Sequence, residues 1–240
     1  ASYFIRKFIV QYMGDVIVYV SSNEVTGFWK IRDEIKQIGL TLAKVVYGAV
    51  DTKCNAISHF LYSKVVVVGH SLGSVVAYDT LNAIINQDQL DKGIRRVVDR
   101  TEAFITLGSP LDKIAFLFRQ KAKDALTRDV LAAAYQPMIL DYKNRPRWWV
   151  NVFCGMDVIS GSLEYYDDPT SAHSEERRVR NFLDPCKWKW LDPQSTHTDY
   201  WKRQPAKSFI YLAATGSMDT LGKCALRHNS KEVSIRTKLN

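Results

Sequence analysis

The stretch KVVVVGHSLG, Lys64–Gly73, decides the fold of this chain. Its four consecutive valines form an unbroken run of β-branched residues, which is typical of a strand buried on both faces in a parallel sheet. A tight turn with two glycines follows the valines. From Leu72 to Ile85 the apolar residues then recur at helical spacing. The sequence therefore predicts a strand, a sharp turn and a helix in direct succession.

Two further apolar runs extend this pattern along the chain. Residues 103–107, AFITL, are followed by Gly-Ser-Pro, and residues 148–154, WWVNVFC, are followed by Gly155. Residues 123–135 lie between these runs and show a helical pattern. Strands that alternate with helices are joined by right-handed crossovers, which makes the strands parallel. We therefore expect an α/β fold, a mainly parallel sheet covered by helices on both faces.

The remaining segments add helices and one long connection. The amphipathic pattern of residues 29–47 predicts a helix, and we expect residues 205–214 to form a closing helix. Residues 4–20 favour a helix, although β-branched residues in the second half of this segment leave a strand open. Residues 160–194 are polar and irregular and predict a long loop. Because no Pro-, Gly- or Ser-rich linker divides the chain, we expect a single domain over residues 1–240.

The composition excludes several classes of protein. Of the 240 residues, 46% are hydrophobic and 24% are charged, which is ordinary for a globular protein and excludes disorder. No run of about 18 apolar residues is present, so we expect no membrane-spanning helix. The four cysteines lack zinc-site spacing and do not define a disulfide scaffold, which favours a reducing compartment. We expect the protein in the cytoplasm or peripherally at a membrane.

The charge of the chain bears on its partners. The formal net charge of +8 favours anionic partners such as a phospholipid surface. Basic and aromatic residues lie close together at 143–149 and at 187–190, and such stretches suit anionic lipid headgroups. Core tryptophans beside solvated charges are the alternative interpretation. No nucleic-acid-binding motif accompanies the charge, so we expect no nucleic acid partner.

The turn after the first strand has the pattern Gly-x-Ser-x-Gly. Ser71 stands at the end of an apolar strand and at the start of a helix, as a nucleophile elbow requires. The turn forces the serine backbone into an unusual conformation and brings strand and helix close, so we expect only small residues at Gly69 and Gly73. The backbone N–H of Leu72 is the expected oxyanion donor.

A serine nucleophile needs a base, and the base needs an acid that orients it. In a fold with such an elbow the acid follows a later strand and the histidine comes last. Asp157 comes directly after the third predicted strand and is the expected acid. Asp167 and Asp168 lie further on, where a solvated turn explains them better.

Five histidines compete for the role of the base. His59 and His70 precede the serine, and the ring of His70 is expected to point away from Ser71. His173 lies in the polar segment, and His228 lies beside basic residues near the end of the chain. His197 stands in a predicted loop just before the last helix, and it is the expected base.

These segments resemble those of a known superfamily. The segment 67–79, VVGHSLGSVVAYD, looks like the nucleophile elbow of lipase-like and esterase-like α/β hydrolases. Residues 106–111, TLGSPL, are similar to the loop after the next strand of these enzymes. The segment from Trp149 to Asp157, and His197 followed by Tyr200-Trp201, resemble their acid and base segments.

The resemblance covers about residues 64–201 and implies a catalytic triad of Ser71, Asp157 and His197. It also implies esters or lipids as substrates and a reaction through an acyl-enzyme, for which no metal or organic cofactor is needed. A fold of this type that binds lipid or protein without catalysis is the alternative. The acyl and alcohol specificity, the segment that forms a lid and the oligomeric state are not encoded in a recognisable pattern.

One feature of the superfamily is missing. These enzymes take a second oxyanion N–H from a loop after an earlier strand, often marked by His-Gly, and no such motif precedes Ser71. Either the opening strands lie upstream of this chain, or the oxyanion hole is built differently. The absence of an initial methionine favours the first explanation.

Overall fold

The structure is a computed structural model that describes residues 10, 14, 28–50, 60–114, 138, 142–167, 177–186 and 193–219. Within these ranges the strand, turn and helix predicted at residues 64–85 are present as β1 and α3. In chain order they are α2 Phe28–Gly48, β1 Val65–His70, α3 Leu72–Leu90, α4 Val97–Arg100, β2 Thr101–Leu107, η2 Tyr142–Asn144, β3 Trp148–Phe153, η3 Glu164–Tyr166, β4 Val179–Leu183, α8 Pro193–Thr198, η4 Asp199–Lys202 and α9 Gln204–Ala214.

The described strands form one four-stranded sheet in the order β1-β2-β3-β4. Each neighbouring pair of strands is parallel. The predicted α/β fold with a parallel sheet is therefore confirmed. Because all four strands run in the same direction, their carboxyl ends lie at one edge of the sheet.

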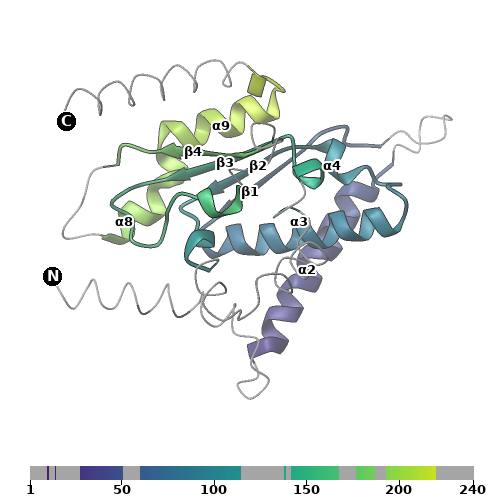
Figure 1. The fold of residues 1–240 in the computed structure, drawn as a ribbon, viewed down its shortest axis with the longest axis horizontal. Coiled ribbons are helices and arrows are strands. Elements are labelled where there is room, and N and C mark those ends of the chain that lie inside the picture. The colour runs from purple at the N-terminus through teal and green to yellow at the C-terminus, as the bar shows by residue number, and fades with distance from the viewer. Residues whose placement is uncertain are drawn as a thin grey trace.

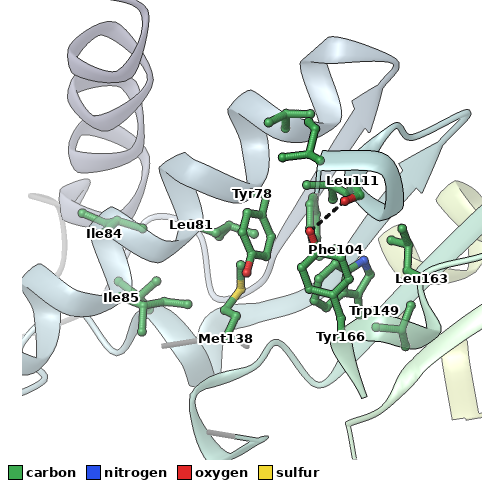
Figure 2. Close-up of a cluster of buried hydrophobic side chains, with 14 of the residues drawn as sticks. Tyr78, Leu81, Ile84, Ile85, Phe104, Leu111, Met138, Trp149, Leu163 and Tyr166 are labelled. Atoms are coloured by element: carbon green, nitrogen blue, oxygen red, sulfur yellow. Dashed lines mark hydrogen bonds between the residues drawn. The ribbon is translucent and has the colours of Figure 1, made fainter. Parts of the chain in front are cut away.

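Helices cover both faces of the sheet (Figure 1). On one face, α3 packs with Tyr78 and Leu81 over the side chains of Phe104 and Trp149, and α2 lies beyond it (Figure 2). On the other face, α9 packs with apolar residues such as Phe209 against the alternate residues of the strands. Successive strand residues point to opposite faces, which is why Phe104 and Ile105 belong to different core clusters.

The first strand is less buried than the sequence predicted. All seven residues of β2 are buried, whereas Val65–Val68 are only half-buried. The difference follows from position, because β1 has a single neighbour within the described sheet and β2 has one on each side. The valine run thus correctly indicated a parallel strand but overstated its burial.

The predicted loop at residues 160–194 contains a strand, so that prediction was wrong. β4 pairs with β3 in parallel register through Val179–Leu183. In its sequence, VRNFL, apolar and polar residues do not alternate regularly, and one residue is charged. Such a sequence is tolerated because β4 has only one neighbour in the described sheet and keeps part of its surface exposed. The guanidinium of Arg180 lies over the ring of Trp148 on the neighbouring strand, 4.5 Å from its centre.

The predicted helices at 29–47 and 205–214 are confirmed as α2 and α9. The predicted helices at 4–20 and 123–135 fall on segments outside the described residues, apart from residues 10 and 14, which are helical. Trp148 and Trp149 are buried in the core, so the stretch at 143–149 does not present them to a surface, and the stretch at 187–190 lies outside the described residues. Within the described ranges, no helix combines the length and apolar character needed to cross a membrane.

Candidate active site

Three side chains singled out from the sequence meet at the carboxyl edge of the sheet. Ser71 follows β1 directly, and Asp157 lies in the turn after β3. His197 lies in α8, which comes after β4, so its predicted position in a loop was wrong and it stands in a short helix. The parallel arrangement of the strands is what brings these distant parts of the chain to one edge.

The backbone of Ser71 adopts an unusual conformation. Its φ of 54° and ψ of −133° lie in a region that residues other than glycine rarely adopt, at a cost of about 1–3 kcal/mol. The Ser71 N–H donates to the Leu107 carbonyl oxygen at 3.0 Å, and the Ser71 carbonyl accepts from the Ser74 hydroxyl at 2.6 Å. These bonds hold the strained turn between β2 and the first turn of α3.

The two glycines of the turn have different reasons to be glycine. A Cβ at Gly69 would lie 2.5 Å from the backbone Cα of Ser74, so no side chain fits there. A Cβ at Gly73 would have no heavy atom of the described residues within 4 Å. The expectation that both positions exclude a side chain is therefore correct at Gly69 and wrong at Gly73.

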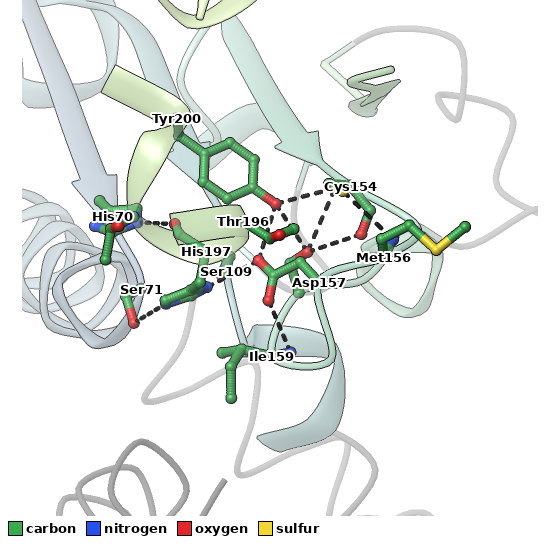
Figure 3. A network of polar contacts seen from close by, with 12 residues as sticks. His70, Ser71, Ser109, Cys154, Met156, Asp157, Ile159, Thr196, His197 and Tyr200 are labelled. Atoms are coloured by element: carbon green, nitrogen blue, oxygen red, sulfur yellow. Dashed lines mark hydrogen bonds and ion pairs between the residues drawn. The ribbon is translucent and has the colours of Figure 1, made fainter. Parts of the chain in front are cut away.

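A continuous chain of hydrogen bonds links the three side chains (Figure 3). The distance from Ser71 Oγ to His197 Nε2 is 2.7 Å, and that from His197 Nδ1 to Asp157 Oδ2 is 2.8 Å. His197 is fully buried and Asp157 is 4% exposed. Since a carboxylate can only accept, Nδ1 carries the proton and Nε2 is left to accept from the serine hydroxyl. The arrangement has the geometry needed to draw a proton from Ser71.

The carboxylate of Asp157 is held at both oxygens. Oδ1 accepts from the Ile159 N–H at 3.0 Å, and Oδ2 accepts from the Tyr200 hydroxyl at 2.9 Å as well as from His197. Burial acts to raise the pKa of Asp157, but the hydrogen bond and the electrostatic interaction with His197, together with these two donors, outweigh it and lower the pKa. Asp157 is therefore ionised at neutral pH.

His70 is oriented by the histidine it neighbours. Its Nε2 lies 2.9 Å from the His197 carbonyl oxygen, and the two rings lie 5.1 Å apart. The carbonyl accepts, so Nε2 carries the proton. Burial lowers the pKa of His70 and outweighs the bond to the His197 carbonyl, which acts to raise it. The sequence assigned no task to His70, and only the packing of α8 against the turn reveals this contact.

Arg203 fastens the segment that carries His197. Its guanidinium donates to the Asp184 carboxylate at 2.7 Å and to the Thr196 carbonyl oxygen at 2.5 Å. Asp184 directly follows β4, so this pair of bonds ties α8 to the end of the last described strand. The sequence analysis missed both residues, because their pairing spans two elements and leaves no local pattern.

A row of polar side chains crosses the sheet behind the site. Thr106, Asn151 and Asn181 stand at the same register position on β2, β3 and β4. The Asn151 amide oxygen accepts from Thr106, and its amide nitrogen donates to Asn181 at 2.8 Å and to the Gly161 carbonyl at 2.9 Å. The row anchors the loop that follows Asp157 to the sheet.

The other residues considered from the sequence do not belong to the cluster of Ser71, His197 and Asp157, apart from Leu72. Asp167 lies beneath β4, where it accepts from the buried Arg145 at 2.7 Å and from the Val179 N–H at 3.0 Å, so it is a structural partner rather than a solvated turn residue. Leu72 is the first residue of α3, and its N–H has no acceptor within the helix. The segments with Asp168, His59, His173 and His228 lie outside the described residues.

Two of the cysteines are joined, which their spacing did not predict. The disulfide Cys154–Cys186 links the residue after β3 to the segment after β4, with Cα atoms 5.9 Å apart. Cys154 lies three residues before Asp157 in the chain. The disulfide therefore joins the ends of β3 and β4 at the edge of the sheet where the site is located.

Comparison with known proteins supports one assignment. No curated protein and no solved structure matches the chain. One family model matches residues 2–121, which is half of the chain, and this match includes the elbow at Ser71 but ends before Asp157 and His197. The strand, the strained serine turn and the helix lie within the matched segment. The chain therefore belongs to the family described as "Putative serine esterase (DUF676)", a family of serine hydrolases.

Proposed function

We propose that this chain is a serine esterase of the α/β-hydrolase type that cleaves carboxylic esters, with Ser71 as nucleophile, His197 as general base and Asp157 as the orienting acid. The observation that carries the proposal is the unbroken hydrogen-bonded chain from Ser71 Oγ through His197 to Asp157 Oδ2. It combines with a strained nucleophile backbone at the start of a helix.

The reaction proceeds by acyl transfer. His197 Nε2 accepts the hydroxyl proton while Ser71 Oγ forms a bond to the ester carbonyl carbon. The tetrahedral oxyanion accepts a hydrogen bond from the backbone N–H of Leu72. It also faces the N-terminal end of α3, whose dipole favours negative charge. The carbon–oxygen bond to the alcohol then breaks, and His197 returns the proton to the departing alcohol. Water, activated by the same histidine, attacks the acyl-enzyme and releases the acid.

Asp157 keeps the imidazole in the productive tautomer. With its proton held on Nδ1 by the carboxylate, His197 presents the lone pair of Nε2 to the serine hydroxyl. The lowered pKa of Asp157 keeps the carboxylate charged, so that it stabilises the imidazolium formed during attack.

A lipid-like ester is the substrate class we propose. The support is the resemblance of the elbow segment to lipases and esterases and the net charge of +8, which would draw the protein toward an anionic surface. Exposed apolar side chains also flank the acid, since Met156 is 50% and Val158 45% exposed.

The test is hydrolysis of p-nitrophenyl esters of increasing acyl chain length by the wild type and by Ser71→Ala. We expect activity in the wild type, loss of at least about a thousandfold in the variant, and labelling of Ser71 by a fluorophosphonate probe. A preference for long chains supports the lipid-like substrate, and a preference for short chains contradicts it. If a wild type that is folded by circular dichroism neither hydrolyses the esters nor takes the label, the esterase proposal fails and a non-catalytic binding role replaces it.

A further inference from the structure

Tyr200 contacts both the acid and the segment of the base. It lies three residues after His197 and is fully buried. Its hydroxyl has three polar neighbours: Asp157 Oδ2 at 2.9 Å, the Cys154 N–H at 3.0 Å and the Ser160 hydroxyl at 3.1 Å (Figure 3). Asp157 Oδ2 is the same oxygen that accepts from His197.

The chemistry of the groups fixes the direction of the bond between Tyr200 and Asp157. A phenol has one proton, a backbone N–H can only donate, and the ionised carboxylate of Asp157 can only accept. The Tyr200 proton therefore points to Asp157, and Cys154 and Ser160 donate to the phenol oxygen. Burial, followed by the charge of Asp157, raises the pKa of Tyr200 well above its usual value, so the hydroxyl remains a donor throughout the pH range of ester hydrolysis.

The ring of Tyr200 is also fixed in position. A Cβ at Gly108, whose φ is +57°, would lie 2.6 Å from the ring, so the backbone after β2 closes on it. The charged and titratable groups around the ring are Asp157, His197, His70 at 5.9 Å and the Arg203 guanidinium at 4.7 Å. Because its ring is fixed, Tyr200 can hold the carboxylate of Asp157 in position.

Resting on the proposed function, we propose that Tyr200 is a positioning residue, whose hydroxyl pins Asp157 Oδ2 against His197 Nδ1 and so aligns the imidazole with Ser71. It touches neither the serine nor the reacting carbonyl and acts through Asp157. Because Tyr200 shares Oδ2 with His197, it also draws electron density from the oxygen that His197 contacts.

The first experiment compares Tyr200→Phe with Tyr47→Phe. Both are buried tyrosines. The Tyr47 hydroxyl forms a hydrogen bond with the Thr101 hydroxyl at 2.6 Å, at the start of β2 and away from the site. We expect Tyr200→Phe to lower kcat by about tenfold with little change in KM, as loss of a hydrogen bond to a charged group does. The acid limb of the kcat/KM profile of Tyr200→Phe should move to higher pH. Without the phenol proton, the negative charge of Asp157 acts more strongly on His197. Tyr47→Phe should leave kcat and the profile unchanged.

A second comparison separates positioning from packing. Ser160→Ala removes a neighbour of the phenol but keeps the bond from Tyr200 to Asp157, so we expect nearly full activity. In an Asp157→Asn background, Tyr200→Phe should cost less than about twofold in the rate of fluorophosphonate labelling. If Tyr200→Phe lowers the rate equally in both backgrounds, or leaves kcat and the pH profile as in wild type, Tyr200 does not act through Asp157.

A readout independent of turnover keeps this inference apart from the esterase proposal. The Nδ1 proton of His197, shared with Asp157, should give a downfield proton NMR signal in the wild type. That signal should be displaced in Tyr200→Phe and unchanged in Tyr47→Phe. Activity that survives Ser71→Ala refutes the proposed function, whereas an unmoved His197 signal in Tyr200→Phe refutes the role of Tyr200 alone.

Discussion

The two glycines of the nucleophile turn illustrate how surroundings decide the role of a single residue. At Gly69 a methyl group would collide with the backbone of α3, 2.5 Å away, and backbone cannot yield as a flexible side chain can. At Gly73 a methyl group meets open space within the described structure. The same residue type in the same motif is therefore required for packing at one position and not at the other.

We predict that Gly69→Ala lowers the free energy of unfolding by about 2 kcal/mol or more, because α3 must move away from β1. Gly73→Ala should change the stability by less than about 1 kcal/mol and in the stabilising direction, since alanine is the better helix former. Urea unfolding of both variants measures the difference. Equal destabilisation by the two substitutions would show that the turn constrains both glycines alike.

At the acid, the decisive property is charge rather than shape. Asp157→Asn keeps the size of the side chain, but an amide can donate to His197 Nδ1 and so stabilise the wrong tautomer. We predict a fall in kcat of about 10⁴-fold with little change in KM. Steady-state kinetics on a p-nitrophenyl ester measures it. A loss of less than tenfold would mean that Asp157 does not orient the base.

At the scale of elements, the position of α8 depends on Arg203. The short helix that carries His197 spans only Pro193–Thr198, so it cannot hold its own orientation. Arg203 connects its Thr196 carbonyl to the buried carboxylate of Asp184. Removing the guanidinium leaves that charge buried without this partner and also releases the helix.

We predict that Arg203→Met lowers the free energy of unfolding by about 2 kcal/mol or more and also lowers kcat. Adding Asp184→Asn to this variant should restore much of the stability, because the buried charge is gone, but not kcat, because the Thr196 bond stays broken. Arg147→Met is the control, since Arg147 forms an exposed pair with Asp219 and should matter by less than about 0.5 kcal/mol. Recovery of both stability and kcat in the double variant would show that Arg203 does not position α8 through Thr196.

Among the elements, those with a clear apolar pattern were predictable. The strands at β1, β2 and β3 and the helices α2, α3 and α9 follow from runs and periodicities that lie within each segment. β4 was not predictable, because a strand with a polar, partly exposed sequence is specified by its pairing with β3 rather than by its own residues. The short helix α8 escaped for the same reason, since contacts with other elements hold it.

At the scale of the whole molecule, His70 couples stability to pH. Burial lowers its pKa in the folded state, so the unfolded chain takes up a proton at a higher pH than the folded chain does. The stability is therefore full above about pH 6.5, the ordinary value for histidine, and falls as the pH drops toward the lowered folded value.

We predict that the free energy of unfolding of the wild type falls as the pH is lowered from about 7.5 to about 5.5. Urea unfolding curves at intervals of about half a pH unit measure this fall. His70→Gln keeps a donor for the His197 carbonyl but does not titrate, so its curve should be flatter over the same range. The carboxylate of Asp157 titrates well below this window, because its pKa is lowered. Parallel curves for the two proteins would show that His70 does not cause the pH dependence.

The sequence by itself determined the parallel α/β architecture and the strained turn at Ser71, because both depend on residues that are neighbours in the chain. It also nominated Asp157 and His197 from their order along the chain, but not the contact between them, which spans 40 residues. The tertiary structure alone decided the pairing of β4, the contacts of His70 and Arg203, and the bond from Tyr200 to Asp157. These depend on strand register and on how helices pack at the carboxyl edge, and side-chain hydrogen bonds between distant segments form only once that packing has set their distances.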